Sequence, residues 1–526
     1  MTYIEGENRE QELLLPDRLE DYVDQSNPVR FIEAFVDTLD IADCGFQRSR
    51  SNVRGRPSYD PRDLLKLYLY GYMNRTRSSR MLERACHINL EAIWLMRKLK
   101  PDFKTIAEFR RNNAKAFKGV FRKFVVLCRS MGLLGGELVA IDGTQLKAQN
   151  NPRKNLTRNR LKRLIAQADQ KIEEYLKRLD DEDAREKGGR KLDRSKLKSK
   201  IASLESELEA MQALEKEMQA EGVTQISDTD PDSRSMSKNP RIAVGYNAQA
   251  SADGKHGLIV AEELSNDIHD YDHLASMAKQ SKENLGDPED LDVTADKGYD
   301  KASQMKEVEQ SGCRCHVPAR KSKGGGSNLY SKDSFQYLKA KDAYRCPAGK
   351  HLPRRYETFK QGKVHYAYTD LGICAGCPIM SKCTKNARGR TIWRREDEEV
   401  AERVVRRMEK EPEKYARRAA TIEKVFGTIK WAMECESLLM KGLSKCQGEW
   451  SLMCSCYNMK RALKLLGTKK LIEALFRSSS NSSQEEWLDK RVNCLLEGLK
   501  TNVVRVFINI DSAPKNAMSH RFMESF

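Results

Sequence analysis

Two short apolar runs that each stop at an aspartate constrain this chain most. Leu138–Ile141 leads into Asp142 in the string LVAIDGT, and Leu291–Ala295 leads into Asp296 in the string LDVTADKGY. Short apolar runs bounded by turn residues predict buried strands. Because ligands of an open α/β sheet bind outside the carboxyl ends of its strands, an acid at that position is expected at a site. The sequence therefore predicts a sheet with two carboxylates at one edge.

The surrounding segments predict a mixed sheet covered by helices. VGYNAQASADGKHGLIVAEELSN, which begins at Val244, alternates with a period of two around a turn at Ala252 to Lys255, so it predicts a hairpin of two strands. Helices are expected near residues 271–285 and 300–310, and CRCHVPAR is expected to form a further strand. Strand, helix and strand in alternation around a hairpin predict an α/β (α+β mixed) fold with flanking helices.

Residues 1–135 are predicted to form a helical N-terminal domain, because PRDLLKLYLYGYMN and FRKFVVLCRSMGLL carry apolar residues at helical spacing. Arginines lie beside short helix starts in this region, at Arg75, Arg77, Arg80, Arg110 and Arg111. A helix that presents arginines from its first turns suits DNA, since phosphates attract positive charge and helix N-termini. A solvated arginine face on an ordinary helix explains the same pattern equally well.

Residues 158–220 carry two apolar series of similar length on either side of Gly188-Gly189. They predict an antiparallel helical hairpin, which we interpret as a self-contained insertion, with dimerisation or DNA contact as alternatives. Three acids follow it, Asp228, Asp230 and Asp232, and could be rival metal ligands. A turn that caps the end of the insertion is the better interpretation, because acids at alternate positions next to proline form turns readily.

The charge balance indicates a polyanionic partner. The chain has 94 Lys+Arg against 76 Asp+Glu, a formal net charge of +18, which favours nucleic acid first and an anionic membrane second. No apolar run approaches the roughly 18 residues of a spanning helix, so no membrane partner is expected. The acidic N-terminus lacks the basic and apolar regions of a signal peptide, so we expect a cytoplasmic protein.

Asp142 and Asp296 would repel each other if brought together without a cation between them. Hard oxygen ligands suit Mg²⁺ or Mn²⁺, and two such ions about 3.5–4 Å apart can activate an attacking oxygen and stabilise a leaving one during phosphodiester displacement. Taken alone, either aspartate is better explained as a helix cap or turn former. The matched pair favours a metal site, and Glu423 in the predicted helix EKYARRAATIEKVFGTIK is the candidate third acid.

The motifs AIDGT, SDTDPDSR, GYNAQ, TADKGYD and RRAATIEKVFGTIK, in this order, resemble those of bacterial insertion-sequence transposases of the DDE superfamily. The resemblance extends from GRPSYDPRDLLKLYLYGYMNRTRSSRMLE to about Leu466. It implies an RNase H-like catalytic domain over residues 136–470, in which Asp142, Asp296 and Glu423 form the catalytic triad and bind two Mg²⁺ or Mn²⁺ ions.

The resemblance also implies DNA contacts. Lys430 fits a family pattern in which a lysine follows the glutamate by seven residues, whereas Arg418 precedes Glu423 by five residues where that pattern has four. Lys297 and other basic residues would hold phosphates, and the N-terminal helices would recognise the terminal inverted repeats through Arg77, Arg80, Arg110 and Arg111. Since two DNA ends must be joined together, a homodimer in a synaptic complex is expected.

Four cysteines lie in an insert at residues 340–390: Cys346, Cys374, Cys377 and Cys383. One C-x₂-C pair with two further thiols permits a tetrahedral site, so structural Zn²⁺ is a candidate cofactor. Reduced structural thiols are the alternative.

The activity that the resemblance implies is that of a DNA transposase, with metal-dependent cleavage at the ends of an insertion sequence and strand transfer into target DNA next to the bacterial nucleoid. Two rivals stay open, an RNase H-like nuclease without strand transfer and a non-catalytic DNA-binding regulator. Joined oligonucleotide products would separate the transposase from the nuclease. Residues 471–526 are expected to form a C-terminal tail, for which the sequence indicates no function.

Overall fold

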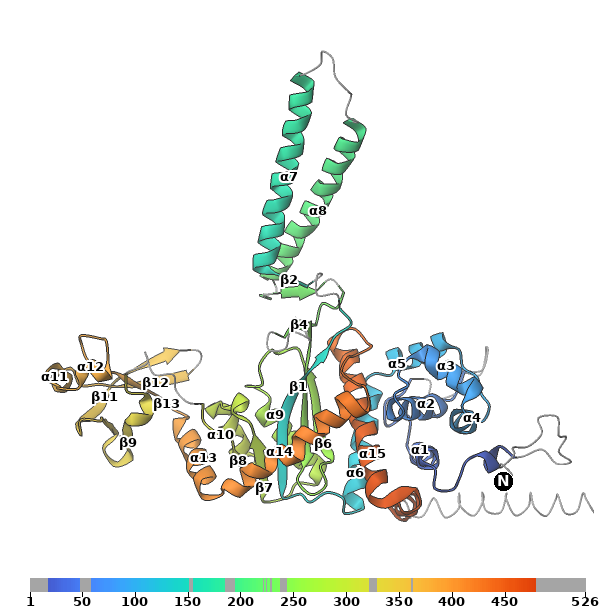
Figure 1. Cartoon of the computed structure of the whole chain (residues 1–526). Coiled ribbons are helices and arrows are strands. Elements are labelled where there is room, and N and C mark those ends of the chain that lie inside the picture. Colours follow the sequence, from blue (N-terminus) through green and yellow to red (C-terminus); the bar gives the residue numbers. More distant parts are fainter. Residues whose placement is uncertain are drawn as a thin grey trace, which may run out of the picture.

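The computed structural model describes residues 18–47, 58–150, 155–184, 194–220, 222–223, 225–227, 229–236, 244–320, 329–360 and 363–478 (Figure 1). Asp228 and the part of the predicted tail after residue 478 lie outside the described residues. No helix in the described part of the chain combines the length and the apolarity that crossing a bilayer requires.

The N-terminal part is helical because its apolar residues recur at helical spacing and its helices have strong start signals. Asn27 and Asp60 each cap a helix that begins with proline, and their side chains accept hydrogen bonds from the backbone N–H groups of Val29 and Arg62. After a short 3₁₀ turn at Leu19–Tyr22, the helices are α1 (Pro28–Asp37), α2 (Pro61–Met73), α3 (Ser79–Ile88), α4 (Leu90–Leu95), α5 (Phe103–Asn112) and α6 (Ala116–Ser130).

A mixed sheet forms the centre of the molecule, in the order β6-β5-β1-β7-β8. β5 is antiparallel to both β1 and β6, whereas β1, β7 and β8 are parallel to one another. This confirms the expected mixed α/β class, and the order is consistent with an RNase H-like sheet. The strands are β1 (Leu138–Lys147), β5 (Val244–Asp253), β6 (Ile259–Ser265), β7 (Leu291–Ala295) and β8 (Cys313–His316), with the short β4 (Arg234–Ser235) beside the start of β5.

Helices cover both faces of this sheet. Ser281 of α9 donates its hydroxyl to Ser251 of β5 at 2.7 Å, whereas Asp142 of β1, which is paired with Ala250, accepts from Arg418 of α14. Because successive residues of a strand point to opposite faces, α9 and α14 lie on opposite sides of the sheet. The flanking helices are α9 (Leu274–Leu285), α10 (Ala302–Gln310), α13 (Glu398–Lys410), α14 (Pro412–Gly427) and α15 (Leu443–Ser478).

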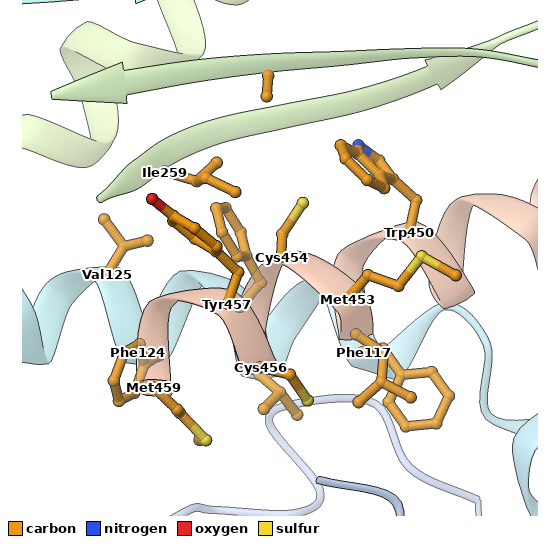
Figure 2. Packing of buried hydrophobic residues seen from close by; sticks show 14 of the residues in the cluster. Phe117, Phe124, Val125, Ile259, Trp450, Met453, Cys454, Cys456, Tyr457 and Met459 are labelled. Carbon is orange, nitrogen blue, oxygen red and sulfur yellow. The ribbon is translucent and has the colours of Figure 1, made fainter. Parts of the chain in front are cut away.

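α15 packs between the N-terminal helices and the sheet, and its middle is buried on all sides. In Figure 2, Trp450, Cys454 and Tyr457 lie between the sheet residue Ile259 and the α6 residue Phe117. A helix that is apolar all round belongs to a core. The backbone leaves the helical region at Gly467, where φ is 77°, so the last part of α15 is a separate helical piece.

Two further units extend from the centre (Figure 1). The long helices α7 (Arg158–Ala184) and α8 (Arg194–Ala220) pack side by side and stand on the two-stranded pair β2 (Asn155–Thr157) and β3 (Gln225–Ser227). The second unit is a sheet of β9 (Gln336–Leu338), β10 (Ala343–Arg345), β11 (His351–Lys360), β12 (Lys363–Tyr368) and β13 (Ile392–Arg395), with the short helices α11 (Leu371–Ala375) and α12 (Met380–Cys383).

The acids that follow the α7–α8 hairpin lie in the expected turn, in which the Ser233 N–H donates to the Asp230 carbonyl at 3.0 Å. Asp230 is fully buried and accepts hydrogen bonds from the Tyr246 hydroxyl at 2.8 Å and from the backbone N–H of Gly442 at 3.0 Å. Asp232 accepts from the backbone N–H of Leu443 at 2.8 Å. In addition to forming the turn, they therefore hold the start of α15, a segment more than two hundred residues away.

We expect Gly448→Ala to destabilise the protein. Gly448 lies in α15 where that helix passes the chain between α5 and α6, and a Cβ there would stand 2.0 Å from the Ala114 carbonyl oxygen. The free energy of unfolding should fall by about 1–3 kcal/mol, the usual cost of overpacking. Gly427→Ala at the end of α14 is the matched control, since its Cβ would meet nothing within 4 Å, and it should stabilise by about 0.5–1 kcal/mol. Urea unfolding measures both, and equal effects would contradict the close approach.

Candidate functional site

Asp142 and Asp296 occupy equivalent positions on two neighbouring parallel strands. β1 pairs with β7 up to Ile141 opposite Ala295, so each aspartate is the next residue of its chain segment. Neighbouring strands lie about 4.8 Å apart, and the two acids are therefore neighbours. The prediction that the strand ends at Asp142 is wrong, because β1 continues to Lys147 with its other edge still hydrogen-bonded to β5. Asp142 marks the point where β1 loses β7 as a partner.

Each aspartate also makes a local hydrogen bond. Asp142 Oδ1 accepts from the N–H of Gly143 at 2.8 Å, and Asp296 Oδ1 accepts from the N–H of Gly298 at 2.6 Å. Burial raises the pKa of the Asp142 carboxyl; Arg418 opposes this rise, and the negative charge of Asp296 adds to it. Only Asp296 has the turn-forming role that a single aspartate would have, because it caps the 3₁₀ turn Lys297–Tyr299, whereas Asp142 lies within the continuous strand β1.

Arg418 of α14 links Asp142 to the third predicted acid. Its Nη1 lies 3.0 Å from Asp142 Oδ2, and its Nη2 lies 3.6 Å from Glu423 Oε1. The Glu423 side chain is 62% exposed. Asp142 and Asp296 are thus direct neighbours, whereas the guanidinium group of Arg418 lies between Asp142 and Glu423.

A fourth acid, Asp270, lies beside Asp296 and was missed in the sequence. Its Oδ1 accepts hydrogen bonds from Asn247 Nδ2 and Gln249 Nε2, each at 2.8 Å. A Cβ added to Gly298 would stand 2.5 Å from Asp296 Oδ1 and 3.4 Å from Asp270 Oδ2, so these two carboxylates are close neighbours. The signal that could have identified it is the acid-rich string SNDIHDYD directly after β6.

The buried Tyr299 lies close enough to these acids for their negative charge to raise its pKa. Its hydroxyl donates to Gln249 Oε1. Burial raises its pKa well above the ordinary value, and the negative charges of Asp270, Asp142 and Asp296 raise it further. Three carboxylates therefore act electrostatically on one buried side chain.

Gly143 is required by the close packing around Asp270. A Cβ at Gly143 would stand 2.4 Å from Gln249 Nε2 and 2.6 Å from Asp270 Oδ1. Any larger residue after Asp142 would push this carboxylate and the amide that holds it away from the sheet. The glycine of AIDGT thus has a steric reason, close packing inside the strand β1, instead of the turn that the sequence suggested.

The donor set of this site fits a hard divalent cation. It consists of carboxylate oxygens, which Mg²⁺ and Mn²⁺ prefer, and one of these acids, Asp142, is largely desolvated and repelled by Asp296. A cation would offset both costs. Arg418 stands between Asp142 and Glu423, so an ion shared by those two acids requires its guanidinium to move.

Asp292, His316 and Glu411 form a second group with metal-ligating atoms within 4.8 Å of one another. Lys414 Nζ already lies 2.9 Å from Asp292 Oδ2 and 2.6 Å from Glu411 Oε2, and Arg314 Nε lies 3.0 Å from Asp292 Oδ1. Burial raises the pKa of Asp292, but hydrogen bonds from His316 and Lys414 outweigh this effect and hold it well below its usual range. We interpret this group as an ion-pair cluster that joins β7, β8 and α14.

The arginines predicted to contact DNA in the N-terminal helices have partners inside the protein. Arg110 is buried and donates to the Tyr72 hydroxyl at 2.9 Å, and Arg77 donates to the Ser437 carbonyl at 2.7 Å. Arg80 is exposed and lies over the Phe103 ring, and Arg111, also exposed, donates to Glu108. DNA contact by these four residues stays a prediction.

The two predicted lysines near the acids differ in environment. Lys297 directly follows Asp296 and is exposed. Lys430 is half-buried after the end of α14, and desolvation lowers its pKa, with Glu436 opposing the decrease. Lys297 can therefore reach a ligand at the acids without rearrangement.

The four predicted zinc ligands lie in the turns and short helices beside the sheet β9–β13, and no three of their sulfur atoms lie within 4.8 Å of one another. They line one small cavity beside Phe335, together with Leu352. Burial raises the pKa of the Cys383 thiol and Arg390 lowers it, while the other three thiols raise it further. These four are half-buried, whereas the other described free cysteines are buried: Cys44, Cys86, Cys128, Cys313, Cys315, Cys435, Cys446, Cys454 and Cys456.

Comparison with known proteins gives two family matches. Residues 345–463 match the family described as Transposase DDE domain, and residues 17–112 match the family described as Transposase domain (DUF772). The first range contains Glu423 and the four cysteines, while Asp142 and Asp296 lie between the two ranges. No curated protein sequence matches the chain. A solved structure of the piggyBac transposase synaptic complex with hairpin DNA is similar at a TM-score of 0.32 and 8% identity, covering 89% of this chain and 85% of that one.

We expect Asp292→Asn to destabilise the fold by about 2–3 kcal/mol, because it leaves a buried His316 and two cations without their carboxylate. The pKa of Asp292 is depressed in the folded state. The stabilisation that Asp292 gives to the fold is therefore complete at pH values above its pKa in the unfolded chain, about 3.9, and is lost as the pH falls through its lower pKa in the folded protein. Urea unfolding at pH 7 and at pH 3 measures the change. Asp290→Asn is the matched control, since that side chain is 82% exposed, and a similar loss in both variants would contradict the cluster.

Proposed function

We propose that this chain, a transposase of the DDE type, uses Asp142, Asp296 and Glu423 as the acids of its catalytic centre. The observation that carries the proposal is the parallel register of β1 and β7, in which the two aspartates occupy equivalent positions. Glu423 comes from α14, within the matched DDE domain, and a single guanidinium separates it from Asp142. Two acids from one sheet and a third from the helix that covers it can surround one phosphate.

The reaction we infer is polynucleotidyl transfer on DNA. Water attacks the terminal phosphodiester of the mobile element and releases a 3′-hydroxyl group, which then attacks a phosphodiester of the target DNA. Two Mg²⁺ or Mn²⁺ ions held by the three acids would supply electrophilic stabilisation of the attacking and leaving oxygens. Since two element ends are joined in one event, we infer a homodimer that acts in the cytoplasm beside the nucleoid.

The chain's own side chains position the DNA and the acids. Asn247 and Gln249 hold Asp270 in place through two hydrogen bonds. We infer that Asp270 adds negative charge beside the two other aspartates and so helps the site to attract a cation. Arg418 neutralises Asp142 before DNA arrives. Once released from Asp142, its planar guanidinium suits a phosphate. Lys297, exposed beside Asp296, is placed to contact the phosphate that is cut.

Cleavage and joining by single-residue variants test the catalytic acids. Duplex oligonucleotides that carry the inverted repeats flanking the gene should be cut and joined to a second duplex in the presence of Mg²⁺. We expect Asp142→Asn, Asp296→Asn and Glu423→Gln each to lower the cleavage rate by about 10³-fold or more, a loss of about 4 kcal/mol of transition-state stabilisation. Asp270→Asn should cost about 10–100-fold, as residues that orient metal ligands do.

Asp290→Asn serves again as the control and should cleave at the rate of the unchanged protein. Cleavage without joined products would indicate a nuclease. Normal cleavage by Asp142→Asn would end the assignment of this site, provided that the variant binds the duplex as tightly as the unchanged protein.

We also propose that Cys346, Cys374, Cys377 and Cys383 bind one structural Zn²⁺ ion. The support is their convergence on one small cavity in a unit whose own apolar core is limited to Phe335, Tyr344, Leu352, Tyr368 and Ile392. A core of this size gains most from a metal cross-link.

Zinc content tests this second proposal. We expect about one zinc per chain by inductively coupled plasma mass spectrometry. Cys377→Ser should lose it and lower the melting temperature, because a tetrahedral site needs all four thiolates. Cys128→Ala, a buried cysteine in α6, is the control and should keep the zinc. A zinc-free protein that Cys377→Ser leaves equally stable would identify the four as reduced structural thiols.

A further inference from the structure

A basic groove lies on the side of α14 away from the catalytic acids. It is a cavity of about 750 Å³ between the β5–β6 turn at Gly254–Gly257, one face of α14 and α15, and we name it the α14–α15 groove. Its lining contains no aspartate or glutamate. Six basic side chains line it: Lys255, Arg417, Lys424, Lys460, Arg461 and Lys464.

The positive charge of the groove is not neutralised by the described protein. None of the six side chains has an ion pair with a described carboxylate, although such pairs are frequent elsewhere, as at Lys414 and Arg418. Arg461 Nε donates to the His256 carbonyl at 2.8 Å, and Lys460 Nζ donates to the Met73 carbonyl at 2.9 Å. These neutral acceptors orient the cations without cancelling their charge, so the groove attracts an anion.

We propose that the α14–α15 groove binds the sugar–phosphate backbone of duplex DNA beside the segment held at the catalytic acids. This inference rests on the proposed transposase reaction. Arg417 and Lys424 are two turns apart on α14, about 10 Å, and Lys460 and Lys464 are one turn apart on α15, about 6 Å. A single phosphate therefore cannot contact both members of the α14 row. A DNA strand carries a phosphate for about every 3.4 Å of helix axis, so a few nucleotides supply separate phosphates to the side chains along a row.

The position of the groove suits a duplex that enters the catalytic site. Consecutive residues of α14 point in different directions, so that Arg418 reaches Asp142 while Arg417 approaches the β5–β6 turn, its Nη2 3.2 Å from the place of a Cβ on Gly254. Gly254 N donates to the Leu138 carbonyl, at the start of β1. Leu138 precedes Asp142 by four residues, about 13 Å of strand. For a duplex whose axis runs along β1, this distance corresponds to about four base pairs between the groove and the scissile phosphate.

Trp431 is an independent sign of a nucleic-acid surface. It lines the groove with 67% of its surface exposed, although it is one of the largest apolar side chains. It lies in the π-helical turn Thr428–Ala432 that follows α14, and such turns are frequent at functional sites. An exposed indole beside cations can stack on a sugar or an unpaired base.

Salt-dependent DNA binding tests the groove. Fluorescence anisotropy would measure Kd for a duplex of about 30 base pairs carrying the element's end. We expect Lys424→Ala/Lys464→Ala to raise Kd about tenfold or more at 0.1 M salt and to lower the slope of log K against log salt by about two, one for each lost phosphate contact. Lys279→Ala/Lys306→Ala is the matched control, because these exposed lysines lie on α9 and α10, and it should change neither quantity.

Two further measurements keep the inference falsifiable. Arg417→Ala alone should lower the slope by about one, which covers the case in which the double variant fails to fold. Neutral methylphosphonates about four base pairs from the cleavage site should weaken binding of the unchanged protein and have little effect on the double variant. Unchanged Kd and slope in both groove variants would overturn the inference.

The failures of the two proposals are distinguishable. Asp142→Asn should keep the wild-type slope while losing cleavage. If it loses cleavage and the groove variants bind normally, the groove inference is wrong and the catalytic assignment stands. If Asp142→Asn still cleaves while the groove variants lose slope, the catalytic assignment is wrong and the groove remains a DNA site.

Discussion

The buried carboxylate of Glu449 joins the helical N-terminal part to the elements that carry the proposed catalytic acids. Glu449 lies in α15 and is fully buried. It accepts a hydrogen bond from the Tyr72 hydroxyl at 2.7 Å and from the backbone N–H groups of Leu439 and Met440 at 2.8 and 3.0 Å. A buried carboxylate without such partners would cost several kcal/mol. Arg110 donates to the same Tyr72 hydroxyl, so the Tyr72 hydroxyl links the Arg110 guanidinium to the Glu449 carboxylate. Loss of any member would leave a buried polar group without its partner.

This network also supports the positions of the proposed catalytic acids. By binding the N–H groups of Leu439 and Met440, Glu449 holds the segment that connects α14 to α15. That segment in turn is hydrogen-bonded to the end of β1, because Lys147 N–H donates to the Glu436 carbonyl at 3.0 Å and Leu438 N–H donates to the Lys147 carbonyl at 2.8 Å. The sheet that carries Asp142 and the helix that carries Glu423 are therefore linked through this segment. A catalytic constellation requires such support, since a displacement of about 1 Å can cost two orders of magnitude in rate.

The sequence predicts the parts of this structure that depend on local pattern. The apolar runs before Asp142 and Asp296 are enough for two neighbouring strands, because parallel strands align their carboxyl ends. The continuation of β1 could not be predicted, since it depends on hydrogen bonds to β5, a strand about a hundred residues later. The same limit applies to Arg110: the sequence suggested a position beside a helix start, whereas it lies in the last turn of α5, and nothing nearby in the sequence indicates Tyr72 or Glu449. Asp270 joins the site only through amides on another strand, and the basic groove is assembled from three separate segments.

α14 divides two sites of opposite charge. On one side it presents Arg418 and Glu423 to the acids of the sheet, and on the other it presents Arg417 and Lys424 to the α14–α15 groove. Because these four side chains stand on one continuous helix, the distance between the catalytic acids and the proposed backbone contacts is set by helix geometry and not by a loop. A phosphate bound in the groove is then held at a fixed distance from the phosphate at the acids. Sequence-independent contacts with the DNA backbone can in this way set the cleavage position, while recognition of the element's end is left to other surfaces.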